Sequence, residues 1–511
     1  MKLKRGLMNI ITGIGSQILI LALGLIVPRF MILTYGSEVN GFFSSITQIL
    51  SYLTLLEAGV GAATIRALYE PIAQDNSLKI SEILGATHKY YKKISFYYLI
   101  GVLGFTIVYP LIVVSQINKI DMMIIIFLSG LSGVIDFYYA ATMKQLLIAE
   151  GRNYVITNIT TFVQVSSYVS KLIIIYLNQS IVFLQISFFV INVVQVFIYK
   201  RYFKTRYNWV KKEVVPDMGA LKQKGSFLIH QITSLIFMST DTVILTLESN
   251  LKIVSIYNVY NMIITALNVL CNTLNDGLSF ILGLTYYEDK KKYVLLHDTY
   301  NIYYTAFVTA MMSCCYILFK PFLILYTGGM DENYILPYLP LLFCLIQILS
   351  GMRMVSNNLI RIAGHMRQTV PRTIAEAIIN LAVSIVLTYR FGIYGVLIGT
   401  IIALLYRTND IILYSDRRLL ERSPIFSYKV IGINSILFCG TVIVNKYLNI
   451  VIKSYTSFFI LGIITVVVIC GIFFIVNSII CRKEYIFFKK VFLRKMIRKL
   501  KCKAFIDNLG E

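Results

Sequence analysis

Apolar segments long enough to cross a membrane recur along the whole chain, with shorter polar segments between them. Because a helix needs about 20 mainly apolar residues to cross a bilayer, each segment predicts a spanning helix. The predicted spans are 7–30, 39–62, 94–116, 122–146, 154–177, 181–199, 224–247, 253–285, 299–319, 335–355, 370–389, 393–413, 427–446 and 454–480. The pattern therefore predicts an all-α polytopic membrane protein with about fourteen transmembrane helices.

Lys and Arg are distributed unequally between the two sides that these spans define. When residues at span ends are counted with their adjoining loops, 40 of the 48 fall on the side of the N-terminus and six on the other. The remaining two, Arg29 and Lys171, lie inside spans. Since cytoplasmic loops collect Lys and Arg, both termini are predicted to be cytoplasmic. The excess of Lys and Arg in the predicted cytoplasmic segments accounts for the net charge of +23, so no nucleic-acid partner is expected.

Composition and motifs exclude several classes of protein. Hydrophobic residues make up 57% of the 511 and charged residues 14%, whereas soluble domains carry about 25% charge. The eight cysteines form no C-x-x-C pair, and no G-x-x-x-x-G-K-[ST] occurs, so neither a metal site nor a P-loop is expected. Asp331-Glu332, in a loop of about fifteen residues, is the only external acidic pair that an integral-membrane glycosyltransferase could use. We therefore expect no enzymatic activity and no cofactor, apart from a coupling Na+ or H+.

Matching residues recur in equivalent topological places about 213–219 positions apart, as Glu57 and Asp276 do. This spacing predicts a parallel duplication, with the halves related by a pseudo-two-fold axis along the membrane normal and a site between them. The predicted organisation is a six-helix lobe at 1–203, a cytoplasmic linker at 204–223, a second six-helix lobe at 224–418, two additional helices at 419–480 and a basic tail at 481–511. The tail is expected to lie on anionic membrane lipids, with a protein partner as the alternative.

Two repeat-related spans carry neutral polar residues every three or four positions, which places them on one helical face. In the eighth span these are Asn258, Asn261, Thr265, Asn268, Asn272, Asn275 and Ser279, and in the second span Asn40, Ser44, Thr47, Ser51 and Thr54. An unsatisfied polar group in hydrocarbon costs several kcal/mol. The faces therefore line a wet cavity or form hydrogen bonds between helices. Amides and hydroxyls suit sugar hydroxyls as ligands.

Ionisable residues inside spans are rare and often functional. Arg29 and Lys171 lie near outer span ends, where they bind a ligand or extend to the membrane surface. Glu57 and Asp276 are repeat-related and either line a cavity or pack at a helix end, while Asp241 is placed to pair with Arg29 across the halves. Arg66 lies at an inner span end, where lipid headgroups are the simpler partner.

Four motifs resemble those of a known family: LLEAGVGAATIR (55–66), DTVIL with IYNVYNMI (241–245, 256–263), RIAGHMR (361–367) and FGIYGVLIGT (391–400). They look like signatures of Wzx-type flippases for O-antigen or capsule repeat units, in the superfamily that also holds multidrug/toxin exporters and peptidoglycan-precursor flippases. The resemblance implies a V-shaped, two-lobed bundle with a central cavity in a bacterial cell membrane. It also implies a lipid-linked oligosaccharide substrate, carried on undecaprenyl pyrophosphate and moved from the inner to the outer leaflet.

The resemblance also assigns roles to residues. Arg29, Lys171 and Arg66 would meet the pyrophosphate, and the span-eight asparagines would meet sugar. Asp241, Glu57 or Asp276 would bind a coupling cation, and other polysaccharide-assembly proteins would be partners. The uncharged stretch from Ile14 to Val27 departs from peptidoglycan-precursor flippases. The alternative is a cation-coupled multidrug exporter of the same superfamily, which usually has twelve spans and a cavity of aromatic and acidic residues.

Overall fold

The computed structural model describes residues 2–57, 59–211, 214–221, 240–448, 450, 452 and 454–490. All regular structure in these residues is helical. The elements of the first half are α1 (Lys2–Tyr35), α2 (Ser37–Leu53), η1 (Thr54–Glu57), α3 (Val60–Ala73), α4 (Ser77–Ile112), α5 (Lys119–Ile135), η2 (Asp136–Ala140), α6 (Ala141–Ala149), α7 (Asn153–Tyr176), α8 (Ile181–Arg206) and η3 (Met218–Leu221). Those of the second half are α10 (Leu251–Glu288), α11 (Lys290–Thr327), α12 (Leu339–Met352), α13 (Met354–Ile362), α14 (Met366–Phe391), α15 (Ile393–Tyr414), η4 (Ser415–Leu419), α16 (Ile425–Tyr447), α17 (Tyr455–Ile480) and α18 (Arg482–Phe488).

Twelve of the described helices are long and apolar enough to cross a membrane, and each coincides with one predicted span. The polytopic all-α fold is therefore confirmed. The second predicted span, 39–62, is interrupted: α2 ends at Leu53, a 3-10 turn follows, and α3 begins at Val60. Gly59 between them has a φ of 86°, a left-handed conformation that glycine adopts without steric cost. The seventh predicted span, 224–247, lies mostly outside the described residues, which resume as a helix at 240–248.

The chain divides into two compact units. The first unit contains residues 1–262, 329–333 and 385–396, and the second contains 263–328, 334–384 and 397–511. The boundaries of the predicted lobes, linker, additional helices and tail stay predictions.

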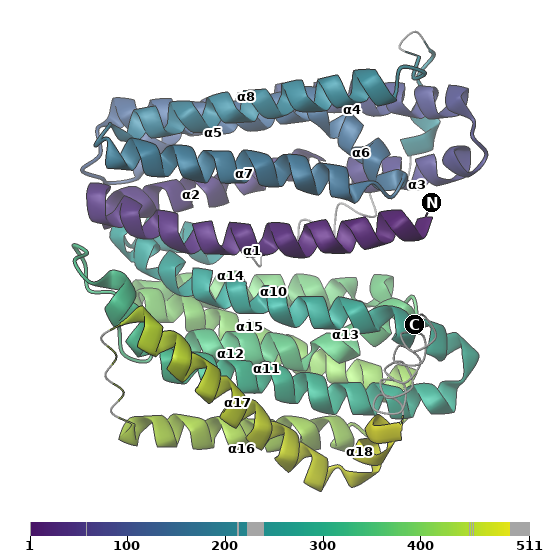
Figure 1. Ribbon diagram of the computed structural model, residues 1–511, viewed down its shortest axis with the longest axis vertical. Coiled ribbons are helices and arrows are strands. Elements are labelled where there is room, and N and C mark those ends of the chain that lie inside the picture. The colour runs from purple at the N-terminus through teal and green to yellow at the C-terminus, as the bar shows by residue number, and fades with distance from the viewer. Residues whose placement is uncertain are drawn as a thin grey trace, which may run out of the picture. The chain divides into compact units, whose positions relative to one another are not determined.

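The first unit contains a bundle in which α1 packs on α7, α4 on α5, and α8 on both α5 and α7 (Figure 1). Phe42, Tyr91 and Val102 are completely buried in its core. Gly130 of α5 faces Val102, where an added Cβ would overlap the valine side chain. Glycine thus allows α4 and α5 to approach closely, as small residues do in membrane bundles.

In the second unit α11 is the central helix, and α12, α16 and α17 pack against it. Val308 and Met312 of α11 are almost completely buried. Gly351 of α12 lies directly against Val308. The core of this unit is therefore assembled around a helix whose exposed surface is small.

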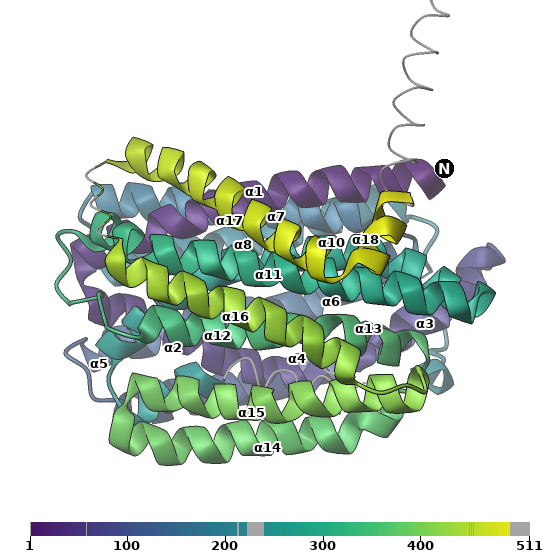
Figure 2. The same cartoon turned by 90° about the horizontal axis from the view of Figure 1, so that it is seen from below.

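Helices α14 and α15 lie side by side (Figure 2), and Gly395 and Gly399, four residues apart, face α14. A Cβ on Gly395 would overlap the backbone of Leu387, and one on Gly399 would lie 2.8 Å from the Cα of Ser384. This is the G-x-x-x-G pattern that lets two membrane helices approach at backbone distance.

Replacing Gly399 with alanine is expected to lower the free energy of unfolding by about 1–3 kcal/mol, because the methyl group overlaps backbone that cannot move freely. Gly432→Ala in α16 is the matched control, because no heavy atom lies within 4 Å of a Cβ at that position. Thermal unfolding of the purified variants in detergent checks this prediction. Equal changes in Tm for the two variants would contradict it.

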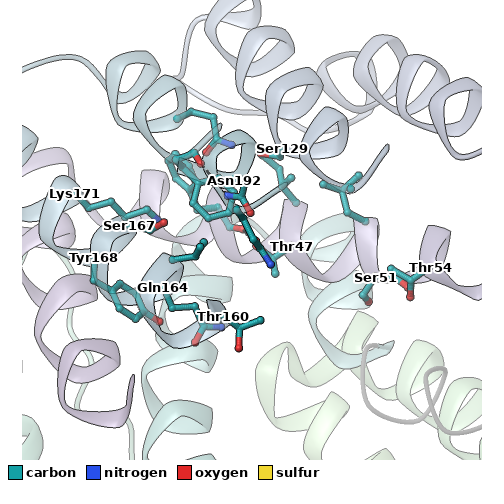
Figure 3. A pocket seen from close by; sticks show the side chains of 18 of the residues that line it. Thr47, Ser51, Thr54, Ser129, Thr160, Gln164, Ser167, Tyr168, Lys171 and Asn192 are labelled. Atoms are coloured by element: carbon teal, nitrogen blue, oxygen red, sulfur yellow. Dashed lines mark hydrogen bonds between the residues drawn. The ribbon is translucent and has the colours of Figure 1, made fainter. Parts of the chain in front are cut away.

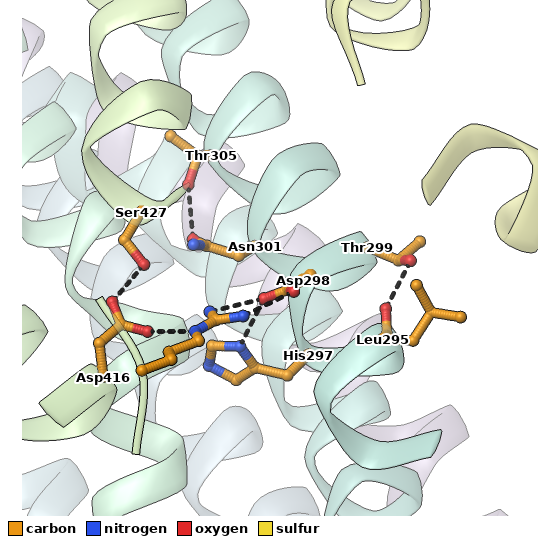
Figure 4. A network of polar contacts seen from close by, with 9 residues as sticks. Leu295, His297, Asp298, Thr299, Asn301, Thr305, Asp416 and Ser427 are labelled. Carbon is orange, nitrogen blue, oxygen red and sulfur yellow. Dashed lines mark hydrogen bonds and ion pairs between the residues drawn. The ribbon is translucent and has the colours of Figure 1, made fainter. Parts of the chain in front are cut away.

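A buried ionic network fastens α11 to the segment between α15 and α16 (Figure 4). The Nη1 and Nη2 atoms of Arg422 each donate to the carboxylate of Asp298 at 2.7 Å, and its Nε donates to Asp416 in η4 at 2.8 Å. The hydroxyl of Ser427, on α16, donates to Asp416 at 2.6 Å. Arg422 is thus matched by two carboxylates, which lie on two different elements.

Candidate functional site

A cavity of about 590 Å³ lies within the first unit, between α2, α7 and α8 (Figure 3). Its volume falls in the range typical of ligand pockets. The lining contains thirteen polar and six other residues, and the described lining has no Asp or Glu. The lining residues are Phe43, Ile46, Thr47, Leu50, Ser51, Thr54, Tyr98, Ser129, Gly133, Thr160, Val163, Gln164, Ser167, Tyr168, Lys171, Gln185, Phe188, Asn192 and Gln195.

Three helices present one face each to this cavity, because their lining residues are three or four positions apart. On α7 the face runs from Thr160 to Lys171, twelve residues that cover about 16 Å of helix axis. On α2 it runs from Phe43 to Thr54 at the start of η1, and on α8 from Gln185 to Gln195. The cavity is therefore elongated along the helices.

Most hydroxyl groups of the lining donate to the backbone of their own helices. Thr47 Oγ1 donates to the carbonyl of Phe43 at 2.8 Å, and Thr160 Oγ1 donates to the carbonyl of Ile156 at 2.8 Å. The Asn192 amide likewise donates to the carbonyl of Phe188 at 2.8 Å. Because the proton of each hydroxyl is already used, these groups offer oxygen lone pairs to a ligand.

Two lining groups are buried and have no hydrogen-bond partner within the described structure. They are the Ser167 hydroxyl and the Gln185 Nε2, on residues that are 5% and 2% exposed. Buried polar groups are normally paired, and each exception needs an explanation. Both atoms are closed off from the open space of the cavity, so they mark no contact with a ligand in this conformation.

Lys171 provides the positive charge of the lining. It is partly buried, and its Nζ lies 5.8 Å from the ring centre of Phe43 and 5.3 Å from that of Phe188. The described lining offers it no carboxylate. An ammonium group held among aromatic rings, without a counter-charge in the lining, favours an anionic ligand.

The structure brings together four of the residues selected from the sequence: Thr47, Ser51, Thr54 and Lys171. Asn40 of the same α2 face lies outside the cavity. Its Nδ2 is buried and donates to the Ser255 hydroxyl at 2.7 Å, which is a packing contact.

The polar face of α10 lies outside the described lining of this cavity. Asn275 is buried, and its carbonyl oxygen accepts from Tyr300 at 2.8 Å and from the Asn358 amide. Asn268 accepts from Gln347 of α12. Hydrogen bonds between helices therefore occupy both carboxamides. Asn258 and Asn261 are partly buried, while Thr265 and Asn272 are exposed.

Glu57 and Asp241, two of the candidates for a coupling cation, have different hydrogen-bond partners. Glu57 accepts a hydrogen bond of 2.5 Å from the hydroxyl of Tyr91, which accepts in turn from Gln145 at 2.9 Å. Asp241 is buried and accepts from the Tyr257 hydroxyl at 3.1 Å. The side chain of Asp276 lies outside the described residues. No three His, Cys, Asp or Glu side chains gather into a metal-binding group in the described part of the chain.

Two cations selected from the sequence lie elsewhere. Arg29 is partly buried on α1, and Arg66 is exposed on α3. Neither belongs to the described lining of the cavity. The phosphate-binding role that the resemblance implies therefore stays a prediction for both.

The acidic pair Asp331-Glu332, which the sequence predicts to be external, has structural partners. Asp331 accepts from the Ser37 backbone N–H at 3.0 Å and from its hydroxyl at 2.5 Å, and Glu332 pairs with Lys252 at 2.6 Å. Burial raises the pKa of Asp331, but the donors on Ser37 outweigh this effect and leave the pKa below its ordinary value. An acid that stays ionised and paired is a poor proton donor.

Sequence reasoning missed the polar faces of α7 and α8. Thr160, Gln164 and Ser167 recur at the same spacing that identified α2, and Gln185, Asn192 and Gln195 repeat it on α8. The same periodicity test, applied to these spans, would have found both.

Comparisons with solved structures identify the fold. A multidrug resistance MATE family transporter of the MOP superfamily, in an inward-facing conformation, aligns with a TM-score of 0.67 and 14% identity, over 79% of this chain and 95% of that one. The lipid II flippase MurJ, in an inward closed conformation, aligns with a TM-score of 0.68 and 13% identity, over 93% and 99%. The sequence matches no protein-family model and no curated protein. The chain therefore has the fold of the MOP-type transporters and flippases.

Proposed function

We propose that this protein is a flippase for lipid-linked oligosaccharides. It would move repeat units carried on undecaprenyl pyrophosphate from the inner to the outer leaflet of a bacterial cell membrane, for the assembly of surface polysaccharide. The observation that carries the proposal is the cavity of the first unit, where twelve neutral polar side chains and Lys171 stand beside six other residues and the described lining has no carboxylate.

Carbohydrate fits this lining because each sugar hydroxyl both donates and accepts hydrogen bonds. The Thr hydroxyl oxygens can accept from sugar hydroxyls, since their own protons are used within the helices, and the carbonyl oxygen of Asn192 is an acceptor as well. Gln164 and Lys171, which also line the cavity, carry amide and ammonium donors. A sugar headgroup could therefore replace its hydrogen bonds to water with hydrogen bonds to these groups at a small cost in free energy. Hydrocarbon offers no such hydrogen-bond partners.

Pyrophosphate fits the remaining feature of the cavity. Lys171 supplies an ammonium group, a common ligand of phosphate oxygens, at one end of the polar face of α7. An anion near Lys171 would offset the cost of holding a charge in a low-dielectric site. The lipid tail could remain in the bilayer while the headgroup occupies the cavity.

Glu57 is the residue that we propose for coupling to H+. It lies in the first unit, as the cavity does, and its hydrogen-bond partner is the neutral Tyr91. A carboxylate held by a hydroxyl rather than by a fixed cation can take up and release a proton as its surroundings change. Asp136, by contrast, is paired with Lys144 at 2.7 Å.

A cation-coupled multidrug exporter is the second candidate, because the fold also occurs in such exporters. Phe43, Phe188 and Tyr168 give the cavity aromatic surface that an organic cation could contact. The described lining lacks a carboxylate and contains Lys171, which would repel cationic drugs. The charge of the cavity therefore favours the anionic substrate.

Deletion of the gene in its native strain tests the proposed function. Surface polysaccharide is expected to disappear while lipid-linked repeat units accumulate on the inner leaflet, where impermeant probes on the outside cannot reach them. Complementation with the wild-type gene should reverse both effects. Unchanged surface polysaccharide in a strain without a substitute transporter, together with increased sensitivity to cationic dyes, would instead support the exporter.

A further inference from the structure

A small basic pocket lies at the ends of α14 and α15, within the second unit. Its volume is about 160 Å³, room for about five waters at liquid density and enough for a hydrated phosphate group. It is lined by Arg372, Asp410, Leu413, Tyr414, Arg417 and Arg418.

The local helix geometry gathers these residues. Asp410, Leu413, Tyr414, Arg417 and Arg418 are three or four positions apart, so they share one face where α15 continues into η4. η4 is a π-helical turn, Ser415–Leu419, that contains both terminal arginines. Such turns are rare and are found frequently at functional sites.

The carboxylates near this pocket are already matched by other arginines. Glu376 pairs with Arg353 at 2.5 Å, and Asp410 pairs with Arg407 at 2.5 Å. Arg372 reaches Asp410 only at 3.3 Å. This cluster therefore contains three guanidinium groups, the third being that of Arg372, but only two carboxylates.

The remaining donors of the pocket have no acidic partner. Arg417 and Arg418 are exposed, and neither belongs to an ion pair formed by the described residues. The Nη1 of Arg372 is buried without a hydrogen-bond partner in the described structure. The Arg372 guanidinium stacks at 4.8 Å over the Tyr414 ring, which holds the group in place.

We propose that this pocket binds the phosphate of an anionic membrane phospholipid. Guanidinium groups match phosphate oxygens through paired N–H donors, and three of them converge here. The pocket lies at the end of two membrane-spanning helices, on the side predicted to be cytoplasmic. Ile402 and Tyr406, two turns and one turn before Asp410 on α15, are exposed and would contact the acyl chains.

Native mass spectrometry of the purified protein in detergent tests this site, with phosphatidylglycerol and phosphatidylcholine as separate probes. Arg417→Gln with Arg418→Gln should bind phosphatidylglycerol about tenfold more weakly and leave phosphatidylcholine binding unchanged. The matched control is Arg201→Gln with Lys204→Gln, which removes two exposed charges from the end of α8. Because all four side chains are exposed, Tm is expected to change little in either variant.

A third arm adds inorganic phosphate to the wild-type protein. Phosphatidylglycerol binding is expected to survive millimolar phosphate, because the acyl chains contribute to lipid affinity. Full displacement by phosphate would overturn the proposal in favour of a site for a soluble anion. Equal loss of phosphatidylglycerol in the test and control variants would also overturn it. The assay requires no transport, so its result is independent of the proposed function.

Discussion

Replacing Lys171 with methionine is expected to weaken binding of a pyrophosphate-linked substrate by about 10- to 150-fold. A hydrogen bond to a charged group contributes about 1.5–3 kcal/mol, and every 1.4 kcal/mol is tenfold in affinity. Methionine has an apolar side chain of similar length, so it can still pack beside Phe43 and Phe188, while the ammonium group over their rings is lost. The measurement is the rate at which surface polysaccharide appears in a deletion strain that expresses the variant at wild-type level.

Two further variants separate the role of the charge from that of packing. Lys171→Arg should retain much of the activity, because it keeps a cation in the cavity. Lys204→Met removes an exposed lysine of α8 that does not line the cavity, and it should transport normally. If Lys171→Met transports as well as Lys204→Met, Lys171 does not bind the phosphate.

Replacing Asp298 with asparagine is expected to lower the free energy of unfolding by about 3 kcal/mol or more. Removing one partner of a buried ion pair leaves the other charge uncompensated, at a typical cost of about 3–5 kcal/mol. Arg422 would keep Asp416 as a partner, which places the expected cost at the low end. Thermal unfolding of the purified protein in detergent measures this effect.

The exposed pair Lys290–Glu421 is the control for this prediction, since its side chains are 57% and 75% exposed. Lys290→Gln should change the free energy of unfolding by less than about 1 kcal/mol, as is usual for surface pairs. A loss for Asp298→Asn no larger than this would show that the network in the second unit contributes little to stability.

The long apolar segments of the sequence predicted most of the fold, because membrane spans are recognised mainly by their length and apolar content. It did not predict the interruption of the second span at Gly59. That break depends on a single left-handed residue, and the surrounding sequence, Leu55–Arg66, is apolar enough to read as continuous helix.

The candidate site was predicted only in part. Helical spacing selected Thr47, Ser51 and Thr54, which line the cavity, but it also selected Asn268 and Asn275, which bond to neighbouring helices. Spacing locates a polar face, whereas only packing decides whether that face meets another helix or an open cavity. The faces of α7 and α8 have the same spacing as that of α2, and they were missed because the test was not applied to those spans.

The cavity lies within one unit of the protein, whereas the sequence predicted a site between two halves. Its lining comes from residues between Phe43 and Gln195. The faces of α7 and α8 are only 14 positions apart in the sequence, from Lys171 to Gln185. A headgroup site formed by one bundle can be assembled before the rest of the chain has folded.

Photo-crosslinking from position 168 shows whether a carbohydrate headgroup enters the cavity of the first unit. Tyr168 lines the cavity, and a photoreactive phenylalanine derivative there preserves its size; Phe162, 57% exposed elsewhere on α7, is the matched control position. In membranes supplied with lipid-linked repeat units, we expect the adduct at position 168 to carry carbohydrate and the adduct at position 162 to carry only lipid. Carbohydrate-free adducts at 168, with carbohydrate captured at 162 or at neither position, would contradict this expectation.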